Sequence, residues 1–377
     1  MGTPNGFGVT LQNMFGAWAK ENLRFFYNRA EYHPQPKSSG IDFRFAPVPA
    51  SLGRRFAIPK ILGLRPEWRG QYSNTWLRWN LRGFRPDLVF SSVHSIHSIR
   101  FGDWIARQTG KPHALHVMDE PFHGVELGEA KELLGRTCSF MTISDTMRSA
   151  YLERFGQDSK VFHNGAEPSF FNLSPANRKE EAQIRLRFVG NLYQLQHFQA
   201  IEDIAEAVSR FNQNSPKQKA VLEIFGNESP SGCSSRILKA GEVFFHGPIP
   251  LEQRMETIAW ADILVIPFTF DTGQFESYRL SIPTKLPENL ATGIPVFLYG
   301  PKGMAATDLC LRHGLGTAQT ERSIPAVLDF LQSFASDPGP FRSKALEAKR
   351  FAKENLSAEA TSRRFLKHMS ELCQQAA

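Results

Sequence analysis

From about residue 86 onward, short apolar runs alternate along the chain with longer amphipathic stretches. The apolar runs predict buried strands, and the amphipathic stretches predict helices with one apolar face. In the first half, the predicted strands are 87–91, 113–118, 140–143 and 160–162, and the predicted helices are 99–108 and 145–155. This alternation is typical of βαβ units that build a parallel sheet.

The alternation resumes after a polar segment that contains proline, asparagine and serine. Strands are predicted at 184–189, 220–225, 243–245, 263–267 and 295–298, and helices at about 200–210, 251–259 and 283–291. A last amphipathic helix over 357–375 places Phe365, Met369 and Leu372 on one face. We therefore predict an α/β protein with two doubly wound Rossmann-like domains. Their bounds are 1–168 and 184–355, with a linker over 169–183 and a C-terminal helix over 356–377.

Composition excludes several classes of protein. Hydrophobic residues make up 41% of the 377 positions, and charged residues make up 21%, which is too apolar for a disordered chain. No apolar run is long enough to span a membrane, and the N-terminus lacks the pattern of a signal peptide. The four cysteines have no zinc-site spacing. We expect a cytoplasmic protein with reduced thiols and without a bound metal.

The segment 281–296 carries the most specific chemistry. Ser281 is positioned to cap a helix, and Gly293 stands where a helix end needs positive φ. The N-terminus of a helix attracts phosphate, and Lys285 would lie on its first turn. Glu288, three residues on, could accept hydrogen bonds from both hydroxyls of a ribose. The alternative is a surface ion pair between Lys285 and Glu288 at helical spacing.

Two further groups of residues are candidates in the first half. Gly6 and Gly8 form a glycine-rich loop that opens a predicted helix over 11–21, although a plain turn explains them equally. Because only five residues precede Gly6, the first strand of the domain is expected to be missing. His116, Asp119 and Glu120 end a predicted strand, where ligands bind in such sheets. We assign them a catalytic role, while His116 has a core position as its alternative.

The net charge of +7 comes from a basic excess in the first third of the chain. Within 51–85, basic and aromatic side chains alternate, which suits an anionic lipid surface. RNA binding by stacking and a solvated loop with tryptophans packed inward are the alternatives, and the two-domain organisation favours the membrane over nucleic acid. The residues assigned to a membrane or acceptor contact are Arg54, Arg55, Arg65, Trp68, Arg69 and Trp76.

The run S-x-P-x-K-x-x-E-x-x-A-x-G-x-P-V over 281–296 resembles the nucleotide-sugar-binding segment of retaining glycosyltransferases of family four, the group 1 glycosyltransferases. Four other segments resemble that family in order and spacing: 142–147, 161–165, 188–192 and 245–250. The resemblance implies a glycosyltransferase B-type fold, with two domains facing a cleft. It implies that the first domain binds the acceptor and the second binds the donor. Gly6, Gly8, Gly190, Asn191, Ser281, Lys285 and Glu288 are the donor-binding residues it implies.

The chain departs from that family in two places. Many members have a second glutamate eight positions before Glu288, where this chain has Leu280. Many also have an arginine after the glycine of the loop that opens the second domain, where Asn191 follows Gly190. Lys285 and the helix N-terminus are then expected to do more of the phosphate binding.

The resemblance implies an enzyme of the exopolysaccharide or capsule type. It would move a hexose, with retention, from a nucleoside diphosphate sugar to a lipid-linked saccharide, at the inner face of the cell membrane. It would need no metal and no nucleic acid. The alternatives are a nucleotide-sugar 2-epimerase of the same fold and an inactive nucleotide-sugar-binding protein.

Overall fold

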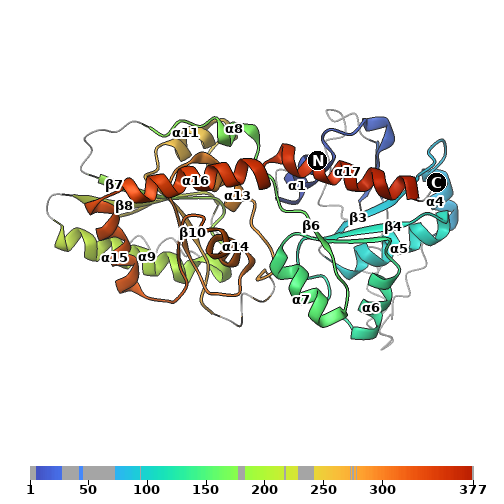
Figure 1. Cartoon of the computed structure of the whole chain (residues 1–377), viewed down its shortest axis with the longest axis horizontal. Helices are drawn as coiled ribbons and strands as arrows, with labels where there is room; N and C mark the ends of the chain where they lie inside the picture. The colour runs from blue at the N-terminus through green and yellow to red at the C-terminus, as the bar shows by residue number, and fades with distance from the viewer. Residues whose placement is uncertain are drawn as a thin grey trace, which may run out of the picture. The chain divides into compact units, whose positions relative to one another are not determined.

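A computed structural model describes residues 6–27, 42–45, 73–93, 95–176, 183–215, 218–227, 242–271, 273, 276 and 278–375 (Figure 1). The chain divides into two compact units. Unit 1 comprises 1–142, 151–160 and 362–377, and unit 2 comprises 143–150 and 161–361.

Unit 1 contains a four-stranded sheet in the order β3-β4-β5-β6. Its strands are β3 (Val89–Val93), β4 (His113–Val117), β5 (Ser139–Thr142) and β6 (Lys160–Val161). A separate parallel pair joins β1 (Arg24–Tyr27) to β2 (Asp42–Phe45). The helices that lie in unit 1 or run partly through it are α1 (Gly6–Phe15), η1 (Lys20–Asn22), α4 (Asn74–Asn80), α5 (Ile96–Thr109), α6 (Leu127–Gly135), α7 (Asp145–Phe155) and α17 (Ala358–Gln375).

The C-terminal helix α17 is anchored in unit 1 by its apolar face. Phe365, Met369 and Leu372 are buried, as the amphipathic pattern predicts. The Phe365 ring lies 5.0 Å from the ring of Phe15 in α1 and 5.4 Å from that of Phe90 in β3, in edge-to-face geometry. Helices from both ends of the chain therefore share one aromatic cluster.

Unit 2 contains a six-stranded sheet in the order β12-β11-β10-β7-β8-β9. Its strands are β7 (Gln183–Val189), β8 (Lys219–Phe225), β9 (Val243–Gly247), β10 (Ile263–Pro267), β11 (Val296–Tyr299) and β12 (Thr317–Gln319), all paired in parallel. The chain builds outward from β7 in one direction through β9, and then in the other direction from β10. The boundary between β7 and β10 is therefore a topological switch point, where ligands bind in open α/β sheets.

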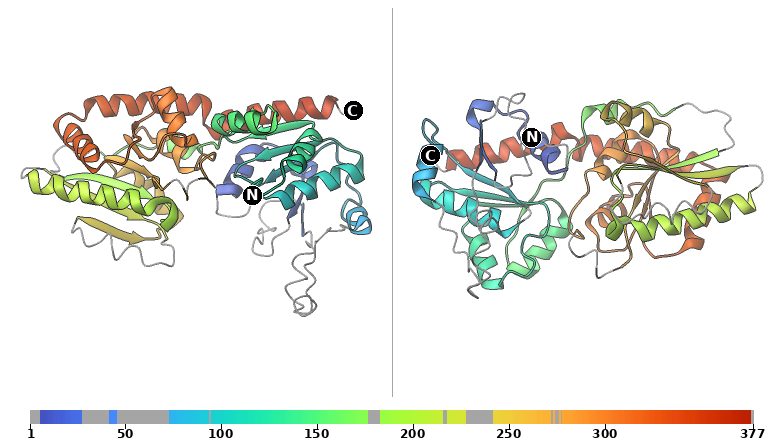
Figure 2. Two further views of the ribbon diagram at one scale, coloured as in Figure 1. Left: turned by 90° about the horizontal axis from the view of Figure 1, so that it is seen from below. Right: turned by 180° about the vertical axis from the view of Figure 1, so that it is seen from behind.

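Helices cover both faces of the unit 2 sheet (Figure 2). Because side chains alternate along a strand, Val265 of β10 joins the core under α9 (Gln194–Asn214) and α15 (Ile324–Ser336), while Leu264 joins the core on the opposite face. The helical elements that complete the unit are α8 (Pro168–Phe171), η4 (Leu251–Gln253), α11 (Arg254–Ala259), α13 (Lys285–Thr292), α14 (Ala305–His313) and α16 (Gly339–Asn355).

The structure confirms the α/β class and the two parallel-sheet domains. It corrects the start of the chain, because α1 begins at Gly6 and ends at Phe15. Gly6 and Gly8 are therefore residues of a helix and not of a loop that precedes one. The apolar residues at 11, 14 and 15 recur at helical spacing and bury one face of α1, which stabilises the helix despite two glycines in its first turn.

Candidate functional site

Glycines follow three neighbouring strands at the carboxyl edge of the unit 2 sheet. Gly190 follows β7, Gly226 follows β8 and Gly247 ends β9, with φ values of +149°, +152° and +72°. The Gly190 amide donates to Phe225 O at 2.7 Å, and the Gly226 amide donates to Gly247 O at 2.8 Å. A Cβ on Gly226 would overlap with the carbonyl of Gly190. The backbone segments at this edge are thus closely spaced, and a side chain at residue 226 would not fit between them.

Lys285, the first residue of α13, lies against this backbone. A Cβ added to Gly190 would overlap with Cε and Nζ of Lys285. Although Lys285 as a residue is only half-buried, its amine lies inward, 4.4 Å from the centre of the Phe188 ring. Burial lowers the pKa of Lys285 to about 8, with Glu288 opposing this shift and Arg254 adding to it. Near neutral pH the lysine is a cation at the switch point, against the backbone of Gly190.

His197 lies in the first turn of α9, near the Phe188 ring. Its Nδ1 accepts from the Tyr193 amide at 3.1 Å, which places the ring proton on Nε2 in the neutral form. Burial, with a smaller contribution from the charge of Lys285, lowers the pKa of His197 well below its usual value. His197 is thus a neutral residue that holds the loop after β7.

Glu288 is buried in α13 and pairs with Arg254 of α11. Arg254 Nη2 lies 2.5 Å from Glu288 Oε2, and the Glu288 side chain is 8% exposed. Burial raises the pKa of Glu288, while the charge and hydrogen bond of Arg254 oppose the rise. The alternative of a surface ion pair between Lys285 and Glu288 is wrong, because Glu288 is buried and Arg254 is its hydrogen-bonded partner.

The boundaries of α13 differ from the prediction at one end. The helix ends at Gly293 with φ +77°, as predicted, but it begins at Lys285 with Thr284 as N-cap residue. The residues before it are held by side chains of unit 2 that come from much earlier in the sequence. Ser144 Oγ donates to Leu280 O at 2.6 Å, and Asn164 Nδ2 donates to Ile282 O at 2.8 Å. Ser281 therefore lies in a tethered loop, and not at the helix cap.

Ser144 and Asn164 are positioning residues that the sequence analysis did not assign. Ser144 Oγ also accepts from the Met147 amide at 2.9 Å, which caps α7. Both residues lie in segments that resemble the glycosyltransferase family, 142–147 and 161–165, and this was the available signal. Local pattern could not show that their partners lie at the entrance to α13.

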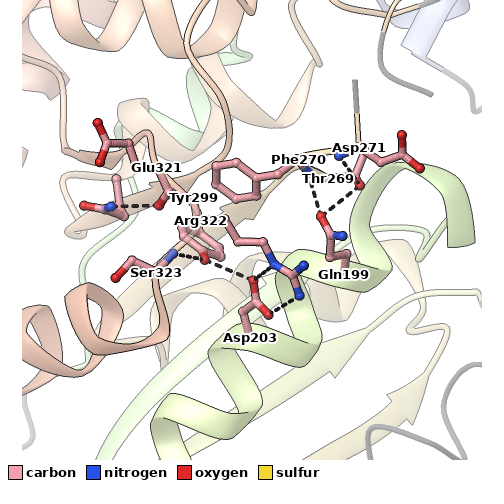
Figure 3. A network of polar contacts seen from close by, with 10 residues as sticks. Gln199, Asp203, Thr269, Phe270, Asp271, Tyr299, Glu321, Arg322 and Ser323 are labelled. Carbon is pink, nitrogen blue, oxygen red and sulfur yellow. Dashed lines mark hydrogen bonds and ion pairs between the residues drawn. The ribbon is translucent and has the colours of Figure 1, made fainter. Parts of the chain in front are cut away.

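A second network fixes the loop after β10 to α9 (Figure 3). Asp203 accepts from Arg322 Nε and Nη2 at 2.8 and 2.9 Å and from Tyr299 Oη at 3.0 Å. One turn earlier on α9, Gln199 Oε1 accepts from the Phe270 amide at 2.9 Å. The ends of β10 and β11 and the segment after β12 are thereby fixed to one helix that begins at the switch point.

In unit 1, the three residues predicted to be catalytic differ in their surroundings. Glu120 accepts from the Phe122 amide at 3.0 Å and from Tyr151 Oη at 3.1 Å, with Arg154 at 3.5 Å. The Tyr151 pKa is raised, chiefly by burial. His116 is fully buried, with Nδ1 3.4 Å from Ser92 Oγ. His116 is thus part of the buried framework of unit 1, whereas Asp119 and Glu120 are both partly exposed after β4.

The predicted membrane contact is only partly visible. Arg54, Arg55, Arg65, Trp68 and Arg69 lie outside the described residues. Trp76 packs inward, 5.5 Å from the Phe26 ring and 6.3 Å from the Phe101 ring, so the prediction for this residue is corrected. Trp79, three residues on, is 71% exposed.

Metal binding and membrane insertion each require a recognisable arrangement of residues. Within the ranges that the structure describes, no cluster of three or more His, Cys, Asp or Glu side chains is arranged to hold a metal ion. None of the helices in those ranges has the length and hydropathy that crossing a membrane requires. Independence from metal stays a prediction.

Residues 183–319, which contain the sheet and the switch point of unit 2, match the family described as "Glycosyl transferases group 1". This part of unit 2 is thus similar to the domain of that family. The matched segment holds Gly190, Asn191, Ser281, Lys285 and Glu288. No curated protein matches the chain.

Solved glycosyltransferase structures share the fold of the whole chain. HepE of Anabaena, solved in complex with UDP, has 12% sequence identity and a TM-score of 0.73, with 98% of each chain covered. The sucrose-phosphate synthase of Thermosynechococcus elongatus has 14% identity and a TM-score of 0.65, with 97% of this chain and 92% of that one covered. The lipopolysaccharide outer core galactosyltransferase WaaB has 16% identity and a TM-score of 0.61, with 98% and 97% covered. At these identities the similarity establishes the glycosyltransferase B-type fold.

Proposed function

We propose that this protein is a glycosyltransferase that uses a nucleoside diphosphate sugar. The observation that carries the proposal is the placement of the Lys285 amine against Gly190 at the switch point, with Glu288 one turn along the same helix. A cation beside exposed backbone suits a diphosphate, and a carboxylate suits the hydroxyls of a ribose. The group 1 domain match and the UDP complex of HepE support the same donor class.

The chemistry needs the departing diphosphate to be stabilised. Lys285 supplies a charge, and the N-terminal end of α13 supplies a fixed dipole, where negative charge develops in the transition state. We propose retention of configuration, with the leaving phosphate oxygen accepting the proton of the acceptor hydroxyl. Of the three residues predicted to be catalytic, Asp119 and Glu120 are partly exposed, and we propose that one of them contacts the acceptor or donor sugar.

For the acceptor, we propose a lipid-linked saccharide used in cell-surface polysaccharide synthesis, with a hexose as the transferred sugar. The exposed residues around α4 support a peripheral contact with an anionic membrane. Trp79 is exposed beside Arg78, Arg82 and Arg85, whose side chains are exposed as well. Cations attract anionic headgroups, and an indole ring favours the interface.

A thermal-shift screen against the diphosphates of uridine, guanosine and adenosine, and against their sugars, tests the donor class. A ligand at 100 times its dissociation constant adds about 2.7 kcal/mol to the free energy of unfolding, so the melting temperature should rise with one base. Lys285→Met should abolish that rise. If no diphosphate or nucleotide sugar stabilises the wild-type protein, the proposal is rejected.

A turnover assay with the stabilising donor separates the proposed activity from its alternatives. Transfer of the sugar to an extracted glycolipid supports a glycosyltransferase. Formation of the 2-epimer of the donor would indicate an epimerase, and binding without turnover would indicate an inactive binding protein.

A further inference from the structure

Arg254 is held in place by two groups that face it in unit 2. Its guanidinium lies 5.2 Å from the centre of the Phe170 ring of α8, and Nη2 donates to Glu288 Oε2 at 2.5 Å. The Arg254 side chain is 28% exposed and the Glu288 side chain 8%. The pair thus joins α11 to α13.

The carboxylate of Glu288 depends on this arginine for its charge. An isolated buried carboxylate takes up a proton, because desolvation disfavours its ionised form. The charged groups that act on Glu288 are Arg254 of α11, Lys285 of its own helix and Glu167 before α8, and the last of these opposes ionisation. Lys349 of α16 contacts the far end of α13, donating to Thr292 O at 3.4 Å.

Arg254 also determines which oxygen of the carboxylate remains for a ligand. It donates to Oε2, which fixes the rotation of the carboxylate and leaves Oε1 as the acceptor for a second donor. A planar guanidinium that is stacked on a ring holds this geometry better than a flexible ammonium would.

We propose that Arg254 is a positioning residue for the nucleotide donor, which keeps the Glu288 carboxylate charged and oriented so that Oε1 accepts the ribose hydroxyls. This inference rests on the proposed function. It adds a residue that lies 34 positions before Glu288 and needs no contact with the donor itself.

Calorimetry with UDP and with 2′,3′-dideoxyuridine diphosphate tests the inference. In the wild-type protein, loss of the hydroxyls should weaken binding about tenfold or more. In Arg254→Gln, that penalty should fall below about threefold at the acidic end of the pH range, where Glu288 takes up a proton, and return as the pH rises. Arg254→Lys should retain most of the penalty. Arg210→Gln, which removes the exposed pair of Arg210 with Glu206, should match the wild type.

The outcomes distinguish this inference from the proposed function. If the wild-type protein binds no nucleoside diphosphate, the proposed function and this inference fall together. If it binds UDP with a hydroxyl penalty that Arg254→Gln retains at every pH, the inference alone is overturned.

If Arg254→Gln is poorly stable, the inference is tested without ligand, by the pH dependence of the melting temperature. The comparison is with the double variant Arg254→Gln/Glu288→Gln, which has no carboxylate to ionise. In the single variant the folded pKa of Glu288 lies above its unfolded value, so its stability falls as the pH rises through that folded pKa. A melting-temperature gap that widens with pH supports the inference. Parallel curves for the two variants overturn it.

Discussion

The side chain of Asn164 donates a 2.8 Å hydrogen bond to the carbonyl of Ile282, although 118 residues separate the two. Ile282 lies just before the helix that begins at Lys285, so the bond fixes the backbone that delivers Lys285 to the switch point. Ser144 makes a similar bond to Leu280 O. The approach to α13 is therefore fixed by side chains from the first half of the chain.

Asn164→Ala should loosen this approach. Because it leaves a buried carbonyl without its donor, we expect a loss of about 1–2 kcal/mol in the free energy of unfolding and weaker UDP binding. Chemical denaturation and calorimetry measure the two effects. Asn355→Ala is the matched control, since Asn355 Nδ2 also donates to a carbonyl, at Phe351 within α16. UDP affinity that is equal in both variants would contradict the positioning role.

Gly190→Ala should disturb the site at its closest contact. The residue has φ +149°, and a Cβ there would overlap with the Lys285 amine. We expect destabilisation of about 2–4 kcal/mol together with loss of UDP binding. Gly135→Ala provides the control, because no atom lies within 4 Å of the added Cβ at the end of α6. If both variants melt at the wild-type temperature, neither the φ value nor the contact with Lys285 restricts residue 190 to glycine.

Strands β7 to β11 of unit 2 were predictable because each contains a short, largely apolar run, and β10 has the predicted bounds of 263–267. Strand β12 (Thr317–Gln319) lacks such a run and was not predicted. Helix α7 was predictable for a similar reason, since Ser144 caps it and its bounds are also those predicted. Amphipathic periodicity indicates which side chains are buried, and this information was sufficient to predict these elements.

The contacts of the site were less predictable. Helical spacing places Glu288 near Lys285, but the hydrogen-bonded partner of Glu288 is Arg254, on another helix. Periodicity within one segment carries no information about which side chain a different segment brings to it. Trp76 and Trp79 show the same limit, because three residues separate an inward-packed ring from one that is 71% exposed.

Lys285→Met should raise stability while it abolishes donor binding. Burial lowers the Lys285 pKa from its usual value to about 8, so the folded protein binds this proton less tightly than the unfolded chain does. The amine therefore costs stability at neutral pH, and the cost diminishes as the pH rises from about 8 toward the unfolded pKa near 10.5. We expect the variant to gain about 1–3 kcal/mol near pH 7, with a smaller gain at higher pH.

As the pH rises above about 8, the stability of the wild-type protein should increase, whereas its UDP affinity should fall because Lys285 loses its charge. Denaturation and calorimetry over this range measure both trends. A stability gain that does not change with pH, or UDP affinity that stays constant through pH 9, would assign the charge effect to another group.

The network around Asp203 should contribute to the free energy of unfolding by fixing the end of the unit 2 sheet (Figure 3). Asp203 is 4% exposed and accepts from both Arg322 and Tyr299. Arg322→Leu leaves a buried carboxylate without its cation, and we expect a loss of about 2–4 kcal/mol. Combining it with Asp203→Leu should restore part of that stability. Independent, additive losses in a double-mutant cycle would show that the two side chains are not coupled.

Membrane association should depend on the exposed face of α4 and the residues after it. Each arginine near an anionic leaflet contributes about 1 kcal/mol. Changing Arg78, Arg82 and Arg85 to Glu should therefore lower vesicle binding by about 100-fold or more at low ionic strength. The effect should shrink at high salt, because screening acts over roughly 8 Å at physiological ionic strength.

Trp79→Ala should weaken vesicle binding at both low and high salt, since an inserted indole ring is not screened. Trp260→Ala is the control, because Trp260 is exposed on unit 2 and is not part of the proposed contact. Co-sedimentation with neutral and anionic vesicles measures both sets of variants. If the wild-type protein pellets equally with both lipids, or if Trp79→Ala and Trp260→Ala behave alike, the exposed face of α4 does not bind the membrane. Its basic residues would then be available to bind an acceptor with anionic groups. Added inorganic phosphate should displace such an acceptor from the wild-type protein and should have no such effect on the arginine variant.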